Sequence, residues 1–161
     1  MSAIASAFVI SEAELPALCA AATPVKRLLR KPLDQFPEFL ASHARQLPAF
    51  SESGFLFTTI LVFLQGLGID LMQGAQVVRA EELRRKRDLL LCIFLTGDQR
   101  AIYLPKLQHF QVSAGEMEQY FEAFTETKEP GIGEALLQGV EYLRAVLAAV
   151  PDGGVVVFNI G

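Results

Sequence analysis

Histidine and cysteine, the side chains most often used as metal ligands and nucleophiles, each occur only twice in this chain. His43 lies on the apolar side of an expected helix at 35–47, where we expect a core histidine or one that packs between helices. His109 has no cysteine or carboxylate at ligand spacing, and the sequence has no HExxH or CxxC motif, so we expect no metal or cofactor. Cys19 and Cys92 lie inside apolar stretches, which is typical of small core residues rather than reactive thiols.

Two further segments carry the residue types of phosphate or nucleic-acid binding. Gly131 and Gly133 precede an expected helix, but no strand comes before them and the third glycine of a dinucleotide-binding motif is absent, so we interpret them as a hinge. The segment 79–88 (RAEELRRKRD) and the basic residues within 26–31 have the composition of a nucleic-acid patch. Interleaved acidic residues at i,i+4 spacing and a pI of about 5.2 favour a solvated helix instead.

The carboxylates late in the chain are the stronger functional candidate. Residues 1–110 hold 12 basic and 10 acidic side chains, whereas residues 111–161 hold 2 and 8. The row consists of Glu116, Glu118, Glu122, Glu126 and Glu129, and its three middle members follow one another at i,i+4 on an expected helix. Neighbouring like charges at this spacing cost about 0.2–0.5 kcal/mol per pair. A basic protein partner would relieve that repulsion. The alternatives are a solubilising surface and, less favoured because too few oxygens converge, a Ca²⁺ or Mg²⁺ site.

A second interpretation places a small ligand or a substrate in a pocket lined by aromatic side chains. The residues in question are Tyr103, His109, Phe110 and Tyr120, which lie close to the polar loop 108–113. No catalytic motif such as GxSxG is present, so the sequence favours a binding protein over an enzyme.

Hydrophobic periodicity and capping signals predict the elements that position these residues. The expected strands are 3–10, 89–96 and 155–160. The expected helices are 11–22, a short basic helix from Thr23-Pro24 to before Pro32, 35–47, 54–66, 79–88, 96–107, 114–126 and 132–150, with a hairpin strand at 100–104 as the alternative to the helix at 96–107. Together they predict one globular domain over residues 1–161 of the α/β (α+β) class. We expect a small three- to four-stranded sheet that includes both terminal strands, packed by six or seven helices. The two terminal strands should be neighbours, because a Val-rich edge would otherwise be exposed.

The apolar interval between Glu52 and Asp70 contains no charge and has nearly the length of a membrane span. Polar residues within it and acidic flanks favour a buried helix at 54–66, and the same helix offers a seam for a homodimer. The N-terminus has no basic residue before its apolar run, and the two cysteines suit a reducing compartment, so we expect a cytoplasmic protein.

The layout places a strand first, acidic helices late and a strand last, without a catalytic motif. It is similar in general character to small bacterial proteins, some of which are immunity proteins that neutralise toxins. That resemblance implies an inhibitor or immunity-type binder. Together with the acidic row it leads us to expect a protein-interaction module that holds a basic partner on the segment 116–129.

Overall fold

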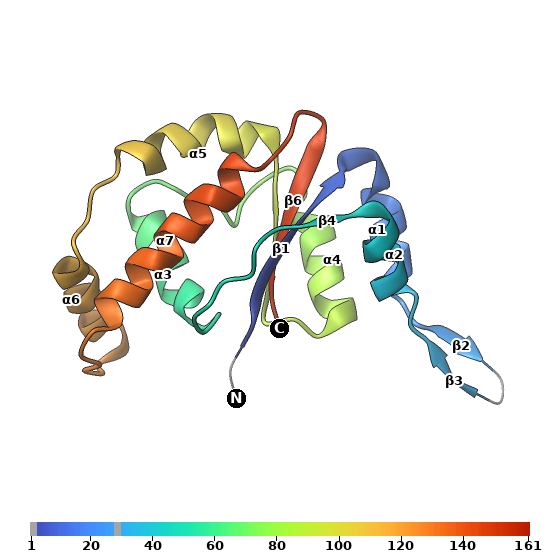
Figure 1. The fold of residues 1–161 in the computed structure, drawn as a ribbon, viewed down its shortest axis with the longest axis horizontal. Coiled ribbons are helices and arrows are strands. Elements are labelled where there is room, and N and C mark those ends of the chain that lie inside the picture. Colours follow the sequence, from blue (N-terminus) through green and yellow to red (C-terminus); the bar gives the residue numbers. More distant parts are fainter. Residues whose placement is uncertain (1–2, 28–29) are drawn as a thin grey trace.

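A four-stranded antiparallel sheet runs through the middle of the protein, with its two longest strands side by side (Figure 1). Its strands are β1 (Ala5–Ser11), β4 (Arg45–Gln46), β5 (Leu91–Leu95) and β6 (Gly154–Ile160), in the order β4–β1–β6–β5. β1 and β6 pair along their whole length, from Ala5 opposite Ile160 to Ser11 opposite Gly154. The prediction that the two terminal strands are neighbours is confirmed.

Helices cover both faces of this sheet in the computed structural model, which describes residues 3–27 and 30–161. The seven α-helices of the described residues are α1 (Leu15–Ala21), α2 (Phe36–His43), α3 (Leu56–Gly66), α4 (Val77–Arg87), α5 (Gly97–His109), α6 (Ala114–Thr125) and α7 (Ile132–Ala148). A 3-10 turn, η1 (Glu12–Glu14), leads into α1. One face carries α3, α5, α6 and α7, and the other carries α1, α2 and α4. The predicted α/β class with a small sheet and six or seven helices is therefore confirmed.

The sheet separates two hydrophobic cores, and the alternation of side chains along each strand assigns residues to one or the other. In β6, Val155 and Val157 belong to the core beneath α1 and α4, while Val156, Phe158 and Ile160 belong to the core beneath α3 and α7. A strand that is buried on both faces has no polar positions to alternate with apolar ones. This explains why β6 has an almost continuous apolar sequence.

Two capping boxes begin the helices that follow β5. Thr96 and Gln99 close the box at the start of α5, which excludes the alternative of a hairpin strand at 100–104. At the start of α6 the Glu116 amide donates to Ser113 Oγ (3.2 Å), and the Ser113 amide donates to the Glu116 carboxylate (2.8 Å). Both pairs satisfy backbone N–H groups that have no partner inside the helix.

The prediction of a short basic helix between Thr23 and Pro32 is wrong for the residues that the structure describes. They form a separate antiparallel pair, β2 (Val25–Arg27) and β3 (Arg30–Leu33), while residues 28–29 of the predicted helix lie outside the described residues. A segment this short gains little from helical hydrogen bonds, and the residue before a proline is biased toward extended backbone. Figure 1 shows the pair extending away from the sheet beyond α1 and α2.

The expected helix at 35–47 ends at His43, and the backbone after it becomes extended to pair β4 with β1. The first of the two alternatives for His43, a core histidine, is also wrong. Its side chain is 43 % exposed and stacks on the Phe39 ring, with 4.4 Å between the ring centroids. The reason is that α2 contributes only half-buried side chains, because it lies at the margin of the core beneath α1 and α4.

α3 packs one side against α7 and leaves Phe55, Val62 and Leu67 exposed along and beside it. It has 11 residues, and none of the described helices is long and apolar enough to cross a membrane.

Candidate functional site

The acidic row lies on α6 and on the turn that joins α6 to α7, at one end of the molecule (Figure 1). The two helices pack closely because Gly133, at the start of α7, touches the start of α6: a Cβ at this position would overlap the carbonyl of Ala114. Gly131, which begins the turn into α7, has a φ of 83°, a conformation that glycine adopts without strain. Gly131 and Gly133, predicted as a hinge, therefore permit the turn into α7 and the close packing of α7 against α6.

Three of the five predicted carboxylates are engaged within the chain. Glu116 closes the capping box, and the hydrogen bonds from Ser113 lower its pKa. Glu118 accepts the Gly131 amide at 3.2 Å, so it fixes the turn before α7. Glu122 forms an ion pair with Lys128 at 3.2 Å.

Glu126 and Glu129 are exposed, and their carboxylates have no hydrogen-bond or ion-pair partner in the part of the chain that the structure describes. Glu126 ends α6 with a left-handed backbone, at φ 56°, where glycine or asparagine is usual. It also places a negative charge at the negative end of the helix dipole. Its residue type is therefore unfavourable in two independent respects.

The acidic surface extends into the first turn of α7. Residues 116–134 contain six glutamates and only one lysine, Lys128. The basic residues of 26–31 belong to the β2–β3 pair at the opposite end of the molecule (Figure 1). The basic residues of the β2–β3 pair therefore do not lie beside the acidic end (Figure 1).

The structure brings together two of the four residues predicted to line an aromatic pocket. Phe110 and Tyr120 both pack against Phe63 of α3, with ring centroids 5.9 and 4.7 Å away. Tyr103 lies beneath the Lys106 ammonium instead, at 5.6 Å.

His109 turns back on its own helix, with Nδ1 2.7 Å from the Pro105 carbonyl oxygen. Phe110 lines a cavity of about 320 Å³ together with Glu141 and Arg144, and the other three predicted residues are not among its lining. A ligand site built on all four remains a prediction.

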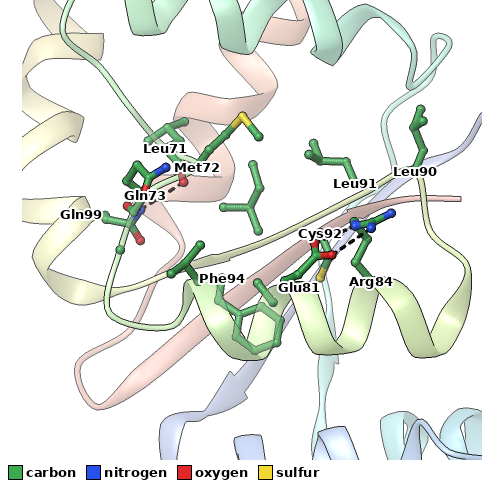
Figure 2. Close-up of a pocket in the computed structure, with 14 residues that line it drawn as sticks. Leu71, Met72, Gln73, Glu81, Arg84, Leu90, Leu91, Cys92, Phe94 and Gln99 are labelled. Carbon is green, nitrogen blue, oxygen red and sulfur yellow. Dashed lines mark hydrogen bonds and ion pairs between the residues drawn. The ribbon is translucent and has the colours of Figure 1, made fainter.

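Sequence reasoning did not find a second cavity of about 250 Å³, which runs along the outer edge of β5 (Figure 2). We refer to it as the β5-edge groove. Its lining residues are Leu71, Met72, Gln73, Gly74, Val77, Ala80, Glu81, Arg84, Leu90, Leu91, Cys92, Ile93, Phe94 and Gln99. They come from α4, from β5 and the residue before it, from the start of α5 and from the loop that precedes α4.

Gln99 holds that loop in place from inside the protein. Its side-chain amide donates to the carbonyls of Leu71 (3.1 Å) and Gln73 (2.7 Å), while its oxygen accepts the amide of Thr96. The sequence predicted Gln99 as a helix cap, but the two contacts to the distant loop have no signal in the sequence.

The other wall of the groove carries an ion pair. Glu81 accepts two hydrogen bonds from Arg84, at 2.7 and 2.9 Å, and these bonds lower the pKa of Glu81 and raise that of Arg84. Arg85 also approaches the Glu81 carboxylate, at 3.5 Å, as the i,i+4 spacing predicts. The remaining predicted pair, Glu82 with Lys86, forms at 2.7 Å.

Neither cysteine has the environment of a nucleophile. Burial raises the pKa of Cys92 to about 12 and also raises that of Cys19, so both thiols stay protonated at neutral pH. In residues 3–27 and 30–161, no three His, Cys, Asp or Glu side chains converge as a metal site would require.

Comparison with protein-family models, with curated proteins and with solved structures finds no match to this chain.

Proposed function

We propose that this protein is an interaction module, of the inhibitor or immunity type, that binds a basic partner protein through the acidic face formed by α6 and the turn to α7. The observation that carries the proposal is Glu126. A side chain that is unfavourable both for its left-handed backbone and for its position at the helix end is expected where function, rather than folding, selects the residue.

The charges around Glu126 support the same conclusion. Glu122, Glu126 and Glu129 lie within eight residues of one another in the chain, and Lys128, the one basic residue of that stretch, pairs with Glu122. A partner that brings Lys or Arg side chains to this face would remove their repulsion and would be attracted from solution by the same field. The Glu122–Lys128 ion pair is exposed and therefore weak, so a basic side chain of the partner could replace Lys128 at little cost in free energy.

The test is to neutralise the two free carboxylates together with Glu122, whose ion-pair partner Lys128 is exposed, while Glu116 and Glu118 stay unchanged. The variant Glu122→Gln/Glu126→Gln/Glu129→Gln removes three negative charges and leaves the capping box and the Gly131 contact intact. Tagged wild type and variant are used to recover partners from native cells, with mass spectrometry and with washes at low and high salt. We expect a stoichiometric basic protein with the wild type, its loss at high salt, and its loss with the variant.

A matched control removes the same charge elsewhere. Glu38, Glu52 and Asp88 are exposed and lie outside α6 and α7, so Glu38→Gln/Glu52→Gln/Asp88→Asn changes net charge equally. The control should retain the partner. Equal loss in both variants would mean that net charge alone matters, and retention by the α6 variant would contradict the proposed face.

A further inference from the structure

The outer edge of β5 is the strongest remaining feature, because it combines unpaired backbone groups with an exposed apolar groove. We infer that the β5-edge groove binds an extended segment of a partner protein, which adds a fifth strand to the sheet beside β5. The segment that fits is extended and has mainly apolar side chains, because both walls of the groove are apolar. This surface is separate from the acidic face of α6.

The register of the sheet shows which backbone groups of β5 are free. Gly161, directly after β6, exchanges both of its backbone hydrogen bonds with Ile4, at 2.8 and 3.1 Å, so Gly161 faces β1. Since backbone groups alternate sides along an antiparallel strand, Ile160 must face β5. The Leu90 amide, which donates to the Ile160 carbonyl at 2.8 Å, agrees with this.

Leu91, Ile93 and Leu95 stand opposite the β6 residues that face β5, so their amides and carbonyls point toward β6. The amides and carbonyls of Cys92 and Phe94 therefore point outward, into the groove. β5 pairs with β6 alone in the sheet, and these outward groups have no partner among the residues that the structure describes. Two donors and two acceptors thus alternate along the edge at the spacing of a strand.

The walls of the groove are apolar and partly open to solvent. Met72, Val77 and Leu90 line it and are 43, 42 and 47 % exposed. In Figure 2, Cys92 and Phe94 point toward α4, while Leu91 points to the opposite side of the strand. A strand in the groove would place its alternate side chains against α4 on one side and against Met72 and Leu90 on the other.

A slender extended backbone satisfies this site better than a globular surface does. Buried amides and carbonyls cost free energy when they are unpaired, and the partner that matches an alternating row of both is another strand. The outer edge of β5 is flanked on one side by the loop that Gln99 holds and on the other side by α4.

Backbone pairing favours one orientation of the bound segment. Antiparallel pairing is slightly more stable than parallel pairing and places the C-terminal end of the bound segment at the start of β5. Glu81 pairs with Arg84 and Arg85, and the Asp88 carboxylate also acts on Arg84, so these four side chains carry no net charge and do not select a charged residue in the bound segment.

The first experiment selects displayed random heptapeptides on the wild type and on Val77→Lys. Val77 lines the groove, whereas the neighbouring Val78 is 77 % exposed and does not line it, so Val78→Lys is the matched control. We expect enriched peptides that are extended and mainly apolar. Their affinity should fall about tenfold or more for Val77→Lys, since a charge would enter an apolar groove, and by less than about twofold for Val78→Lys. Leu90→Lys, at the other end of the groove, provides a second variant.

The second experiment tests the mode of binding with one enriched peptide. Amide hydrogen exchange should slow at Cys92 and Phe94, while the amides of Leu91, Ile93 and Leu95 should change little because they already face β6. N-methylation of the peptide at alternate residues should abolish binding in one register and leave it intact in the other.

Three results would overturn the inference. One is an absence of peptides that prefer the wild type to Val77→Lys. Another is slowed exchange elsewhere than at Cys92 and Phe94. The third is a wild-type dimer in light scattering that Val77→Lys converts to a monomer, which would make a second copy of the chain the occupant of the edge.

Discussion

Replacing Glu126 by glycine should stabilise this protein, although it removes the residue that we propose for partner binding. Glu126 ends α6 with φ 56° and ψ 24°, and its amide donates to the Glu122 carbonyl at 2.9 Å. Glycine adopts this left-handed conformation without a steric penalty and keeps the amide hydrogen bond. The substitution therefore relieves the backbone and leaves the cap in place.

The magnitude follows from two opposing terms. A left-handed backbone costs an ordinary L-residue roughly 1–2 kcal/mol relative to glycine. Glycine adds conformational freedom to the unfolded chain and so costs about 0.4–1 kcal/mol of stability. Removing a negative charge from the helix C-terminus increases the free energy of unfolding by a few tenths of a kcal/mol. The net expectation is a gain of about 1 kcal/mol, which corresponds to a rise in Tm of roughly 2–4 °C for a chain of this length.

The assay is urea denaturation at neutral pH, supported by thermal unfolding. It compares four proteins: the wild type, Glu126→Gly, Glu126→Gln and Asp88→Gly. Glu126→Gln removes the charge but keeps the strained backbone, so it should gain only a few tenths of a kcal/mol. Asp88 also has a left-handed backbone, at φ 51°, at the end of α4. Aspartate tolerates that conformation better and is attracted to Arg84, so Asp88→Gly should gain nothing.

The reasoning fails if Glu126→Gly is no more stable than the wild type, or no more stable than Glu126→Gln. Either result would mean that the left-handed backbone at Glu126 costs no measurable stability. The main support for a functional role of Glu126 would then be lost. If the gain is observed, the same variant should bind the basic partner more weakly than the wild type. Stability and binding would then change in opposite directions at one residue.

Three further predictions follow from single contacts. Gln99→Leu leaves two carbonyls of the loop 71–73 without their donor, so we expect a loss of about 2 kcal/mol in urea denaturation and faster amide exchange in that loop. Ser113→Ala should cost about 1 kcal/mol at neutral pH. Ser113 lowers the pKa of Glu116 from 4.5, so its interaction with the charged Glu116 carboxylate stabilises the fold fully above pH 4.5 and is lost as the pH falls through the lowered pKa. The difference in unfolding free energy between Ser113→Ala and the wild type should therefore narrow between pH 7 and pH 3. With a pKa of about 12, Cys92 should resist iodoacetamide at pH 8 in the folded protein and react in urea, which mass spectrometry measures.

The elements that were predicted correctly are those whose signals lie within a few residues of the chain. Ser113 and Glu116 satisfy each other's backbone across one turn, so their spacing alone marks the start of α6. Leu136, Val140 and Leu143 recur at helical spacing and are all buried, as the periodicity predicts for α7. The terminal strands were placed together because an exposed Val-rich edge would be unfavourable.

The elements that were predicted incorrectly depend on partners far along the chain. Arg45–Gln46 is polar and continues a helical pattern, yet it is extended because its backbone pairs with β1. The region from Val25 to Leu33 forms a strand pair in which Val25 stands opposite Leu33. Neither pairing has a pattern that could be read from the local sequence.

The candidate sites divide in the same way. The sequence alone determined the charge of the acidic row, since residue type and helical spacing decide it. Only the tertiary structure decided which of those carboxylates are free: Glu118 is engaged because α7 brings the Gly131 amide to it, and the left-handed backbone of Glu126 arises where α6 stops.

The β5-edge groove is a property of the tertiary structure throughout. Its strand appears in the sequence as a uniform apolar run, LLLCIFL, in which no residue differs from its neighbours as an edge would require. Which amides point outward is decided by the register with β6, because pairing uses the backbone groups of every second residue and leaves those of Cys92 and Phe94 free.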